Sequence, residues 1–399
     1  MIDEVLATKA GGRARIALRG EGRLVELFFA GDGAADAVGS IVLGRVTAVL
    51  PGMEAAFVDI GAERAGFLSL AAPRADPGEP DEAWNGLEPV QEGAEVLVQI
   101  TKAAQEGKGA GLTRSISLAG RYLVFTPVQP RIAISRRIQD EAEREALAAV
   151  MAEIARPGEG FILRTAARDV GPEALAADAE ALRAQWAAVA ERRTGAPPPQ
   201  VLHGATRGLG EVLRDHAHEG IRRILVDTRR AEAEAQAFCD AHIPDLGTRI
   251  ELWDGAEPMF EALGVEDDIA ESLDPRVTLP CGGSLIIEQT QALTAIDVNT
   301  GRNVGRTSHA DTVRATNLEA AAEIPRQLRL RGFGGITVID FIHMDEESDR
   351  AAVMDLLMEG LSADPAFIRA NGISELGLVE LARRRGDGTL EARLAAAAD

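Results

Sequence analysis

LTAIDVN (Leu293–Asn299) and ITVIDFI (Ile336–Ile342) are two short apolar runs, each of which places one aspartate close to its end. Their length and β-branched residues predict two neighbouring strands, with one long arginine-rich helix between them. Two carboxylates at neighbouring strand ends suit Mg²⁺, which binds one or two carboxylates and completes its shell with water and phosphate oxygens. Arginines of the helix would hold the phosphodiester. The pattern therefore indicates metal-assisted phosphodiester hydrolysis.

For Asp297 and Asp340, taken singly, a structural role is the alternative, because an aspartate at a strand end often closes a turn through backbone hydrogen bonds. Asn299 lies two residues beyond Asp297 and therefore points to the same side of its strand. Three polar side chains at two strand ends favour a shared site, and the residues alone leave both interpretations open.

Three segments in this part of the chain resemble the catalytic segments of the ribonuclease E/G family. They are LTAIDVNTG (Leu293–Gly301), TNLEAAAEIPRQLRLR (Thr316–Arg331) and GGITVIDFIHM (Gly334–Met344). The resemblance runs from the N-terminus to about Arg385 and implies an endoribonuclease that requires Mg²⁺, cleaves single-stranded RNA and senses its 5′ end. It also implies that Asp297 and Asp340 are the metal ligands. Asn299 would orient Asp297 or contact the scissile phosphate.

The expected chemistry follows from this ligand set. No pair of histidines suited to general base catalysis is evident in the sequence, so a water activated by the metal is the expected nucleophile. The products would carry 5′-phosphate and 3′-hydroxyl ends, and Mn²⁺ is a candidate substitute for Mg²⁺. The expected role is the processing or decay of rRNA or mRNA.

Length and composition indicate a globular protein of several domains. The chain has 399 residues, which exceeds what one core usually supports, and is 46% hydrophobic and 26% charged. It has no apolar run of about 18 residues or more, so no membrane span is expected, and its N-terminus does not resemble a signal peptide. The two cysteines, Cys239 and Cys281, are too few for a disulfide framework. A cytoplasmic location is therefore expected.

The formal net charge of −21 is unfavourable for RNA binding, because phosphate contacts normally require a basic surface. A basic stretch between Thr101 and Gln139, opposed only by Glu106, offsets this charge locally. Its cations are Lys102, Lys108, Arg114, Arg121, Arg131, Arg136 and Arg137. Charges more than about 8–10 Å away are screened, so a local basic face could bind RNA within an acidic molecule.

Short alternating segments predict a small β-barrel of the OB-fold type, which binds oligonucleotides on one face. The segments are Ile41–Leu50, Glu54–Ile60, Ala65–Leu70, Ala94–Ile100 and Gly111–Ser117. EAAFVDIGAERAG (Glu54–Gly66) resembles the S1 RNA-binding domain inserted in ribonuclease E/G, which implies RNA contacts by Phe57, Phe67 and Lys108. From the residues alone, the alternative is that both phenylalanines belong to the barrel core.

Arg164 and Thr165, at the end of the strand-like run Gly160–Thr165, match the pair that reads a 5′-monophosphate in that family. An arginine fork beside a hydroxyl suits a terminal phosphate, which offers more oxygens and charge than an internal diester. The family usually continues with Ala-Gly, whereas Arg168 and Asp169 follow here. Losing the glycine removes easy access to positive φ, and Asp169 would repel a phosphate. Whether the sensor works is left open.

The fold class expected overall is a multidomain α/β protein. An S1-type OB-fold barrel would be inserted in an RNase H-like layer and followed by a DNase I-like α/β catalytic domain. The expected ranges are 1–39 and 200–273 for the RNase H-like layer, 40–118 for the S1-type domain, 119–199 for the 5′-sensor region, 274–386 for the catalytic domain and 387–399 for a tail.

The long helix between the two aspartate strands has clear end signals. Ser308 and Asp311 form a capping box at its start, and Gly332 predicts its end. Pro325 predicts a kink, because proline removes one backbone hydrogen bond and clashes with the preceding turn. The arginines of the last turns would either complement the helix dipole or contact the substrate, and the sequence does not decide between these roles. They are Arg326, Arg329 and Arg331.

Four positions depart from the family pattern in or near the catalytic segments. They are Arg314, Pro325, His343 and Glu375. These departures, the altered sensor and the acidity support an alternative function, a catalytically weak or inactive RNA-binding regulator of the same fold. A structural scaffold with no RNA role is a third hypothesis.

No cysteine follows Cys281, whereas the family carries a Cys-Pro-x-Cys motif just beyond the catalytic segments and shares a zinc ion between two chains. Neither structural zinc nor a zinc-linked dimer is therefore expected. The negative charge also opposes self-association, so a monomer or a weak homodimer is predicted.

Overall fold

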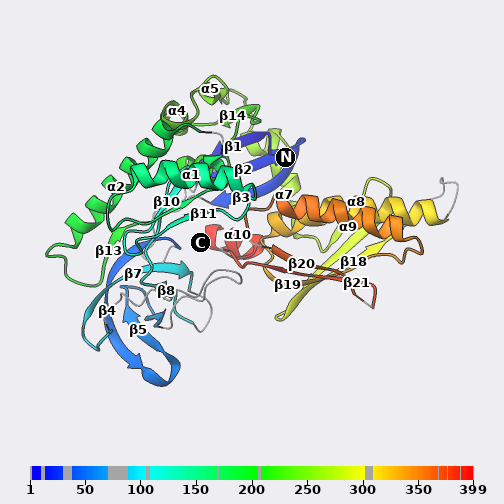
Figure 1. The fold of residues 1–399 in the computed structure, drawn as a ribbon. Helices are drawn as coiled ribbons and strands as arrows, with labels where there is room; N and C mark the ends of the chain where they lie inside the picture. The colour runs from blue at the N-terminus through cyan, green and yellow to red at the C-terminus, as the bar shows by residue number, and fades with distance from the viewer. Residues whose placement is uncertain are drawn as a thin grey trace. The chain divides into compact units, whose positions relative to one another are not determined.

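The fold is mixed α/β, with several sheets and one closed barrel of strands (Figure 1). The computed structural model describes residues 2–9, 14–29, 38–70, 89–104, 108–168, 170–204, 208–301, 309–366, 368–374, 376–386 and 388–398. The chain divides into two compact units, one formed by residues 1–30 with 217–399 and the other by residues 31–216. This division is coarser than the expected domain ranges, which stay predictions.

The first unit begins with a five-stranded sheet in the order β15-β14-β1-β2-β3. Its strands are β1 (Glu4–Thr8), β2 (Arg15–Gly20), β3 (Arg23–Phe29), β14 (Arg223–Val226) and β15 (Ile250–Leu252). A two-residue turn joins β2 to β3, and both of its residues, Glu21 and Gly22, have positive φ (55° and 77°). Such turns match the twist of antiparallel strands. The helices of this part are α4 (Arg229–His242), α5 (Pro244–Gly247), α6 (Met259–Ala262) and α7 (Val265–Leu273).

The same unit contains a six-stranded sheet in the order β16-β17-β18-β19-β21-β20. Its strands are β16 (Arg276–Thr278), β17 (Ser284–Gln289), β18 (Leu293–Asn299), β19 (Gly335–Asp340), β20 (Ile368–Ile373) and β21 (Leu378–Arg383). Helices α8 (His309–Arg331) and α9 (Glu347–Ser362) lie side by side against it (Figure 1), and α10 (Leu390–Ala398) follows. Along β18 buried and exposed residues alternate, so one face packs on the helices and the other carries the exposed side chains.

Helix α8 continues through Pro325, and the kink expected at that proline stays a prediction. Gly360 of α9 provides the space, because a Cβ atom there would lie 2.7 Å from Cγ of Pro325. The helix ends as predicted: Gly332 has φ +67°, and the N–H of Phe333 donates to the carbonyl of Leu328. Ser308, half of the predicted capping box, lies outside the described residues.

The second unit contains the closed barrel, in which the strand order β4-β5-β6-β8-β7 returns to β4. Its strands are β4 (Ile41–Leu50), β5 (Ala55–Asp59), β6 (Gly66–Ser69), β7 (Glu95–Lys102) and β8 (Gly111–Thr113), and β13 (Gln200–His203) pairs with the first residues of β4. Gly44 permits the close strand approach inside the barrel, because a Cβ atom there would lie 2.5 Å from a methyl carbon of Val58. The prediction of a small barrel is confirmed, and its assignment to the S1 type stays a prediction.

A four-stranded sheet, β11-β12-β10-β9, completes the second unit. Its strands are β9 (Leu118–Ala119), β10 (Leu123–Phe125), β11 (Ile132–Ile134) and β12 (Phe161–Leu163), and its helices are α1 (Glu141–Ile154), α2 (Pro172–Arg193) and α3 (Leu209–His216). Helix α1 begins after Asp140, whose carboxylate accepts a hydrogen bond from the N–H of Glu143. Among the helices that the structure describes, none combines the length and apolar character that a membrane-crossing segment needs.

Candidate functional site

The two aspartates of the C-terminal half lie side by side. Strands β18 and β19 are parallel, and their register sets Asp297 directly opposite Asp340. Adjacent strands lie about 4.7–4.9 Å apart, so both side chains start from the same row of the sheet. Both residues are exposed, on the face that does not pack against α8 and α9. The prediction that neighbouring strand ends bring these carboxylates together is confirmed.

Asn299 contributes the third polar side chain at this edge. Its Nδ2 donates a hydrogen bond of 2.7 Å to Oδ2 of Asp297. This hydrogen bond supports the first of the two roles implied for Asn299, which is to orient Asp297, and that role stays a prediction. A contact with a scissile phosphate stays a prediction.

The donor set of this carboxylate pair fits Mg²⁺. No lysine, arginine or histidine in the described ranges forms an ion pair with Asp297 or Asp340, so two like charges stand together without a counter-cation from that part of the chain. Elsewhere in the described ranges, as here, no group of three or more His, Cys, Asp or Glu side chains is arranged to hold a metal ion. A divalent cation would thus depend on two carboxylates, with water and phosphate oxygens completing its shell, as Mg²⁺ often does.

Two residues of α8 hold the segments next to the carboxylates, and the sequence did not indicate their partners. Asn317 is fully buried, and its amide donates to the carbonyl of Ile342 (2.7 Å) and accepts from the N–H of the same residue (3.1 Å). This contact fixes the chain two residues beyond Asp340. Glu319 accepts a hydrogen bond of 2.7 Å from the N–H of Cys281, in the turn between β16 and β17. The one feature of the sequence that could have indicated this contact is the polar residue Asn317 among the small residues of a buried helix face.

The described departures from the family pattern have local partners. Arg314 forms an ion pair with Asp349 of α9 (2.8 Å), and His343 lies 3.3 Å from an exposed carboxylate oxygen of Asp345. Pro325 packs toward Gly360. In the part of the chain that the structure describes, none of these three bonds to a metal-ligand candidate, whereas Glu375 lies outside it.

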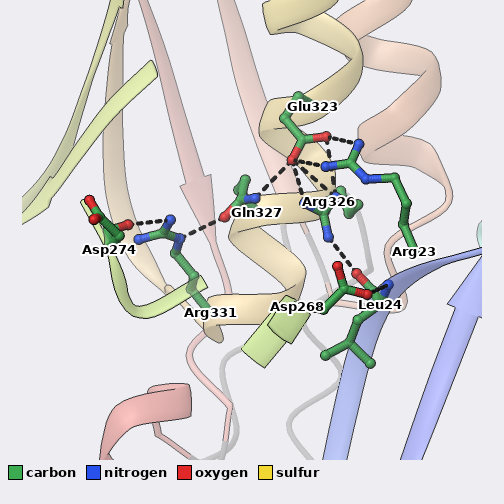
Figure 2. A network of polar contacts seen from close by, with 8 residues as sticks. All are labelled: Arg23, Leu24, Asp268, Asp274, Glu323, Arg326, Gln327 and Arg331. Carbon is green, nitrogen blue, oxygen red and sulfur yellow. Dashed lines mark hydrogen bonds and ion pairs between the residues drawn. The ribbon is translucent and has the colours of Figure 1, made fainter. Parts of the chain in front are cut away.

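The arginines at the end of α8 have partners within the first unit, and Arg329 and Arg331 lie in the last turn, where they also complement the helix dipole. Nη2 of Arg326 binds Glu323 (2.6 Å), Nε of Arg329 binds Glu26 (2.6 Å), and Nε of Arg331 donates to Gln327 (2.7 Å). Figure 2 shows Arg326 and Arg331 pointing into one polar network. Their positive charge is therefore used inside the first unit, and the prediction that they hold the phosphodiester is wrong. The reason is that β3 and α7 pack against the last turns of α8 and bury them.

Phe57 and Phe67 form an exposed aromatic pair on the barrel. They lie opposite each other on β5 and β6, with ring centroids 6.1 Å apart at an interplanar angle of 73°. Their exposed fractions are 36% and 37%, whereas the adjacent residues Ala56, Val58 and Leu68 are buried. The alternative that both rings belong to the barrel core is therefore wrong. An edge-to-face pair that remains open to solvent can stack with a nucleobase.

Lys108 is exposed and lies just before β8, the strand that pairs with β6 beside Phe67. The N–H of Phe67 donates to the carbonyl of Ala110 (2.7 Å), which ties this segment to the aromatic pair. Arg121 does not belong to the predicted basic face, because its side chain is buried. It is 8% exposed, and its Nη1 donates to the carbonyl of Arg214.

Arg164 and Thr165 begin a 3₁₀ turn after β12. Nη1 of Arg164 donates to the carbonyl of Gly120 (2.7 Å) and pairs with Oδ1 of Asp215 (2.9 Å). The hydroxyl of Thr165 lies 3.1 Å from the hydroxyl of Ser135. Both predicted residues are half-buried, so a terminal phosphate could reach them.

The residues after this pair have separate environments. The guanidinium of Arg168 binds the carboxylate of Glu143 in two hydrogen bonds, at 2.8 and 3.0 Å. The repulsion expected from Asp169 has no structural test, because that residue lies outside the described ranges.

Comparison with known proteins gives one consistent result. Residues 117–386 match the family model described as the Ribonuclease E/G family. The chain is 40% identical to Ribonuclease G of Escherichia coli (strain K12) over 398 residues, which cover 98% of this chain and 81% of that protein. It is 39% identical to Ribonuclease G of Haemophilus influenzae, over 97% of this chain and 80% of the relative. Ribonuclease E of Escherichia coli (strain K12) is 38% identical over 93% of this chain, which corresponds to 36% of that longer protein.

Proposed function

Since the chain belongs to the ribonuclease E/G family, we propose that it is an endoribonuclease that cleaves single-stranded RNA with Mg²⁺, in the processing or decay of rRNA or mRNA. The observation that supports this most directly is the parallel register that sets Asp297 beside Asp340 at an exposed sheet edge. The family relation alone would not require the two carboxylates of this chain to meet.

The residues at this edge would divide the work as follows. Asp297 and Asp340 would hold the metal ion. The Asn299 amide would fix the orientation of the Asp297 carboxylate through its hydrogen bond to one oxygen. When bound, Mg²⁺ neutralises charge on the attacked phosphate and lowers the pKa of a water molecule. Asn317 holds the chain beyond Asp340 and so limits movement of the second ligand. Cleavage on this scheme leaves a 5′-phosphate and a 3′-hydroxyl.

RNA would also be held by the barrel, which we assign to the S1 type of OB-fold. Phe57 and Phe67 would stack with bases, and Lys108 would contact a phosphate. Arg164 and Thr165 would bind the terminal phosphate of a 5′-monophosphorylated substrate. By the same family relation we assign the five-stranded sheet to an RNase H-like layer and the six-stranded sheet to a DNase I-like catalytic domain.

The test of this function is cleavage of a 5′-monophosphorylated single-stranded RNA by the purified full chain, with Mg²⁺, with Mn²⁺ and with excess chelator. Cleavage should require a divalent cation, and end-group analysis should find new 5′-phosphates and 3′-hydroxyls. Tight RNA binding without cleavage under all these conditions would instead support the alternative, an RNA-binding regulator of the same fold.

Replacing Phe57 or Phe67 by alanine should weaken RNA binding by about 1–3 kcal/mol per ring, because each ring offers a stacking surface. The melting temperature should change little, since both rings are exposed. A binding titration beside a thermal melt measures both effects.

Two variants provide the controls for that pair. Met53→Ala removes another exposed apolar side chain of the same unit (66% exposed) and should not affect RNA binding. Val58→Ala removes buried volume next to Phe57 and should lower the melting temperature. A melting temperature that falls in the phenylalanine variants as in Val58→Ala, with RNA affinity unchanged, would contradict the stacking role.

A further inference from the structure

A carboxylate holds the arginine that we assign to the 5′-phosphate. Asp215, near the end of α3, pairs with Nη1 of Arg164 at 2.9 Å. Arg214 binds the same carboxylate in a fork, with Nε 3.2 Å from Oδ1 and Nη2 2.9 Å from Oδ2. Burial alone would raise the pKa of Asp215, but the hydrogen bonds and charges of Arg214 and Arg164 lower it below its ordinary value. Asp215 is therefore ionised at neutral pH.

The second contact of Arg164 is equally fixed. Its Nη1 also donates to the carbonyl of Gly120, in a turn that the buried carboxylate of Asp178 organises. Asp178 accepts backbone hydrogen bonds from the three residues that follow Gly120, at 3.2, 2.8 and 2.9 Å. A Cβ atom on Gly120 would lie 2.5 Å from an oxygen of Asp178, so the turn requires glycine. Nη1 is thus held between two acceptors that cannot easily move.

These contacts leave one edge of the guanidinium for a ligand. Within the described residues, the side-chain polar contacts of Arg164 all involve Nη1, whereas Nε and Nη2 have none. Nε and Nη2 form the fork that binds a phosphate with two parallel hydrogen bonds. The local charge also favours an anion, because Arg164 and Arg214 both pair with the Asp215 carboxylate and Arg121 donates to the carbonyl of Arg214 beside it.

We propose that Asp215 is the positioning residue of the 5′-phosphate site, which orients Arg164 so that Nε and Nη2 face a terminal phosphate. The inference rests on the proposed 5′-end sensing. A terminal phosphate carries about 1.5–2 negative charges, against one for an internal diester. A terminal phosphate therefore gains more binding free energy than an internal diester from an arginine that is held so that both Nε and Nη2 donate to it. Asp215 would act on the discrimination between RNA ends and not on the cleavage step.

The experiment measures kcat/KM for one RNA oligonucleotide prepared with a 5′-monophosphate and with a 5′-hydroxyl. The parent protein should prefer the monophosphate. Asp215→Ala should lower that preference by about tenfold or more, through a higher KM for the monophosphorylated RNA, whereas the rate on hydroxyl RNA falls much less. Asp215→Asn keeps an oxygen acceptor for Arg164 and should recover part of the preference.

Glu143→Ala is the matched control, because it removes another carboxylate that binds an arginine of this segment, Arg168. It should leave the preference intact. A parent with no preference would refute the proposed 5′-end sensing itself, and the role of Asp215 with it. A parent with a preference that both Asp215 variants keep would overturn the positioning role alone. Equal losses on both substrates, with a lower melting temperature, would overturn it in favour of a structural ion pair.

Discussion

Replacement of Asp340 by asparagine is expected to lower kcat/KM for RNA cleavage by about a thousandfold, or about 4 kcal/mol of transition-state stabilisation. The substitution keeps the size of the side chain and the pairing of β19 but removes one of the two charges that would hold the metal ion. Because Asp340 is exposed, the free energy of unfolding should change by less than about 0.5 kcal/mol. Asp297→Asn should have the same effect.

Single-turnover cleavage at saturating Mg²⁺, with RNA affinity measured separately in chelator, separates loss of chemistry from loss of binding. Asp345→Asn is the control, because Asp345 is an exposed carboxylate of the loop after β19 that pairs only with His343 in the described ranges. It should retain parental cleavage. Near-parental, Mg²⁺-dependent cleavage by either strand variant would refute the two-carboxylate site, and cleavage by the parent in chelator would refute the metal.

Replacement of Glu323 by alanine should lower the free energy of unfolding by about 3–5 kcal/mol. Glu323 is buried on α8 and binds Arg23 of β3 (2.8 Å) and Arg326 (2.6 Å), and it accepts a hydrogen bond from Gln327 (2.8 Å), as Figure 2 shows. Its loss leaves the largely buried guanidinium of Arg326 without a carboxylate, whereas Arg23 is half exposed. Burial and the neighbouring Arg326 already lower the pKa of Arg331, so a more positive net charge, as after loss of the Glu323 carboxylate, is unfavourable here.

Glu347→Ala offers a matched comparison for chemical denaturation. Glu347 forms the same type of Glu–Arg pair three residues apart on a helix, with Arg350, but its side chain is 83% exposed against 8% for Glu323. Its loss should cost no more than about 1 kcal/mol. Equal, small losses for the two variants would show that the network in Figure 2 does not stabilise the unit.

The effect of Glu323 should depend on pH in one direction. Burial alone would raise its pKa, but hydrogen bonds and charge from Arg326, with Gln327 and Arg23, hold the pKa below the ordinary value of 4.5. A carboxyl group with a lowered pKa in the folded state stabilises that state at pH values above its unfolded pKa. The stability difference between parent and Glu323→Ala should therefore be full above pH 4.5 and shrink as the pH falls through the lower folded value.

The sequence predicted the elements whose signals are local. The barrel strands, the end of α8 at Gly332 and the two aspartate strands follow from alternation and turn residues. The pairing of Asp297 with Asp340 follows because each aspartate stands near the end of its strand. The orientation of Phe57 and Phe67 could not be predicted in this way. Alternation assigns them to one face of their strands but does not say which face is exposed.

The long-range partners of residues on α8 could not be predicted from local signals, unlike the pairs of Arg326 with Glu323 and Arg331 with Gln327, which are three and four residues apart. Arg23 and Glu323 are separated by 300 residues, and no spacing in the sequence relates them. The same holds for Arg329 with Glu26 and for the amide of Asn317 with Ile342. Local patterns identified the arginines as a group, but only the packing of β3 on α8 decides that they serve the interior.

The insertion of the second unit between residues 30 and 217 determines the order in which the protein can fold during synthesis. Strand β1 pairs with β14, so the first strands made must wait for a segment about 220 residues later, and β3 waits longer still for α8. Residues 31–216 form their own barrel and sheet and are complete before that point. Domains usually fold from the N-terminus onward during translation. Here the inserted unit can complete its fold before the unit that carries the N-terminus, in which β1, β2 and β3 pair with one another first and the other edge of β1 waits for β14.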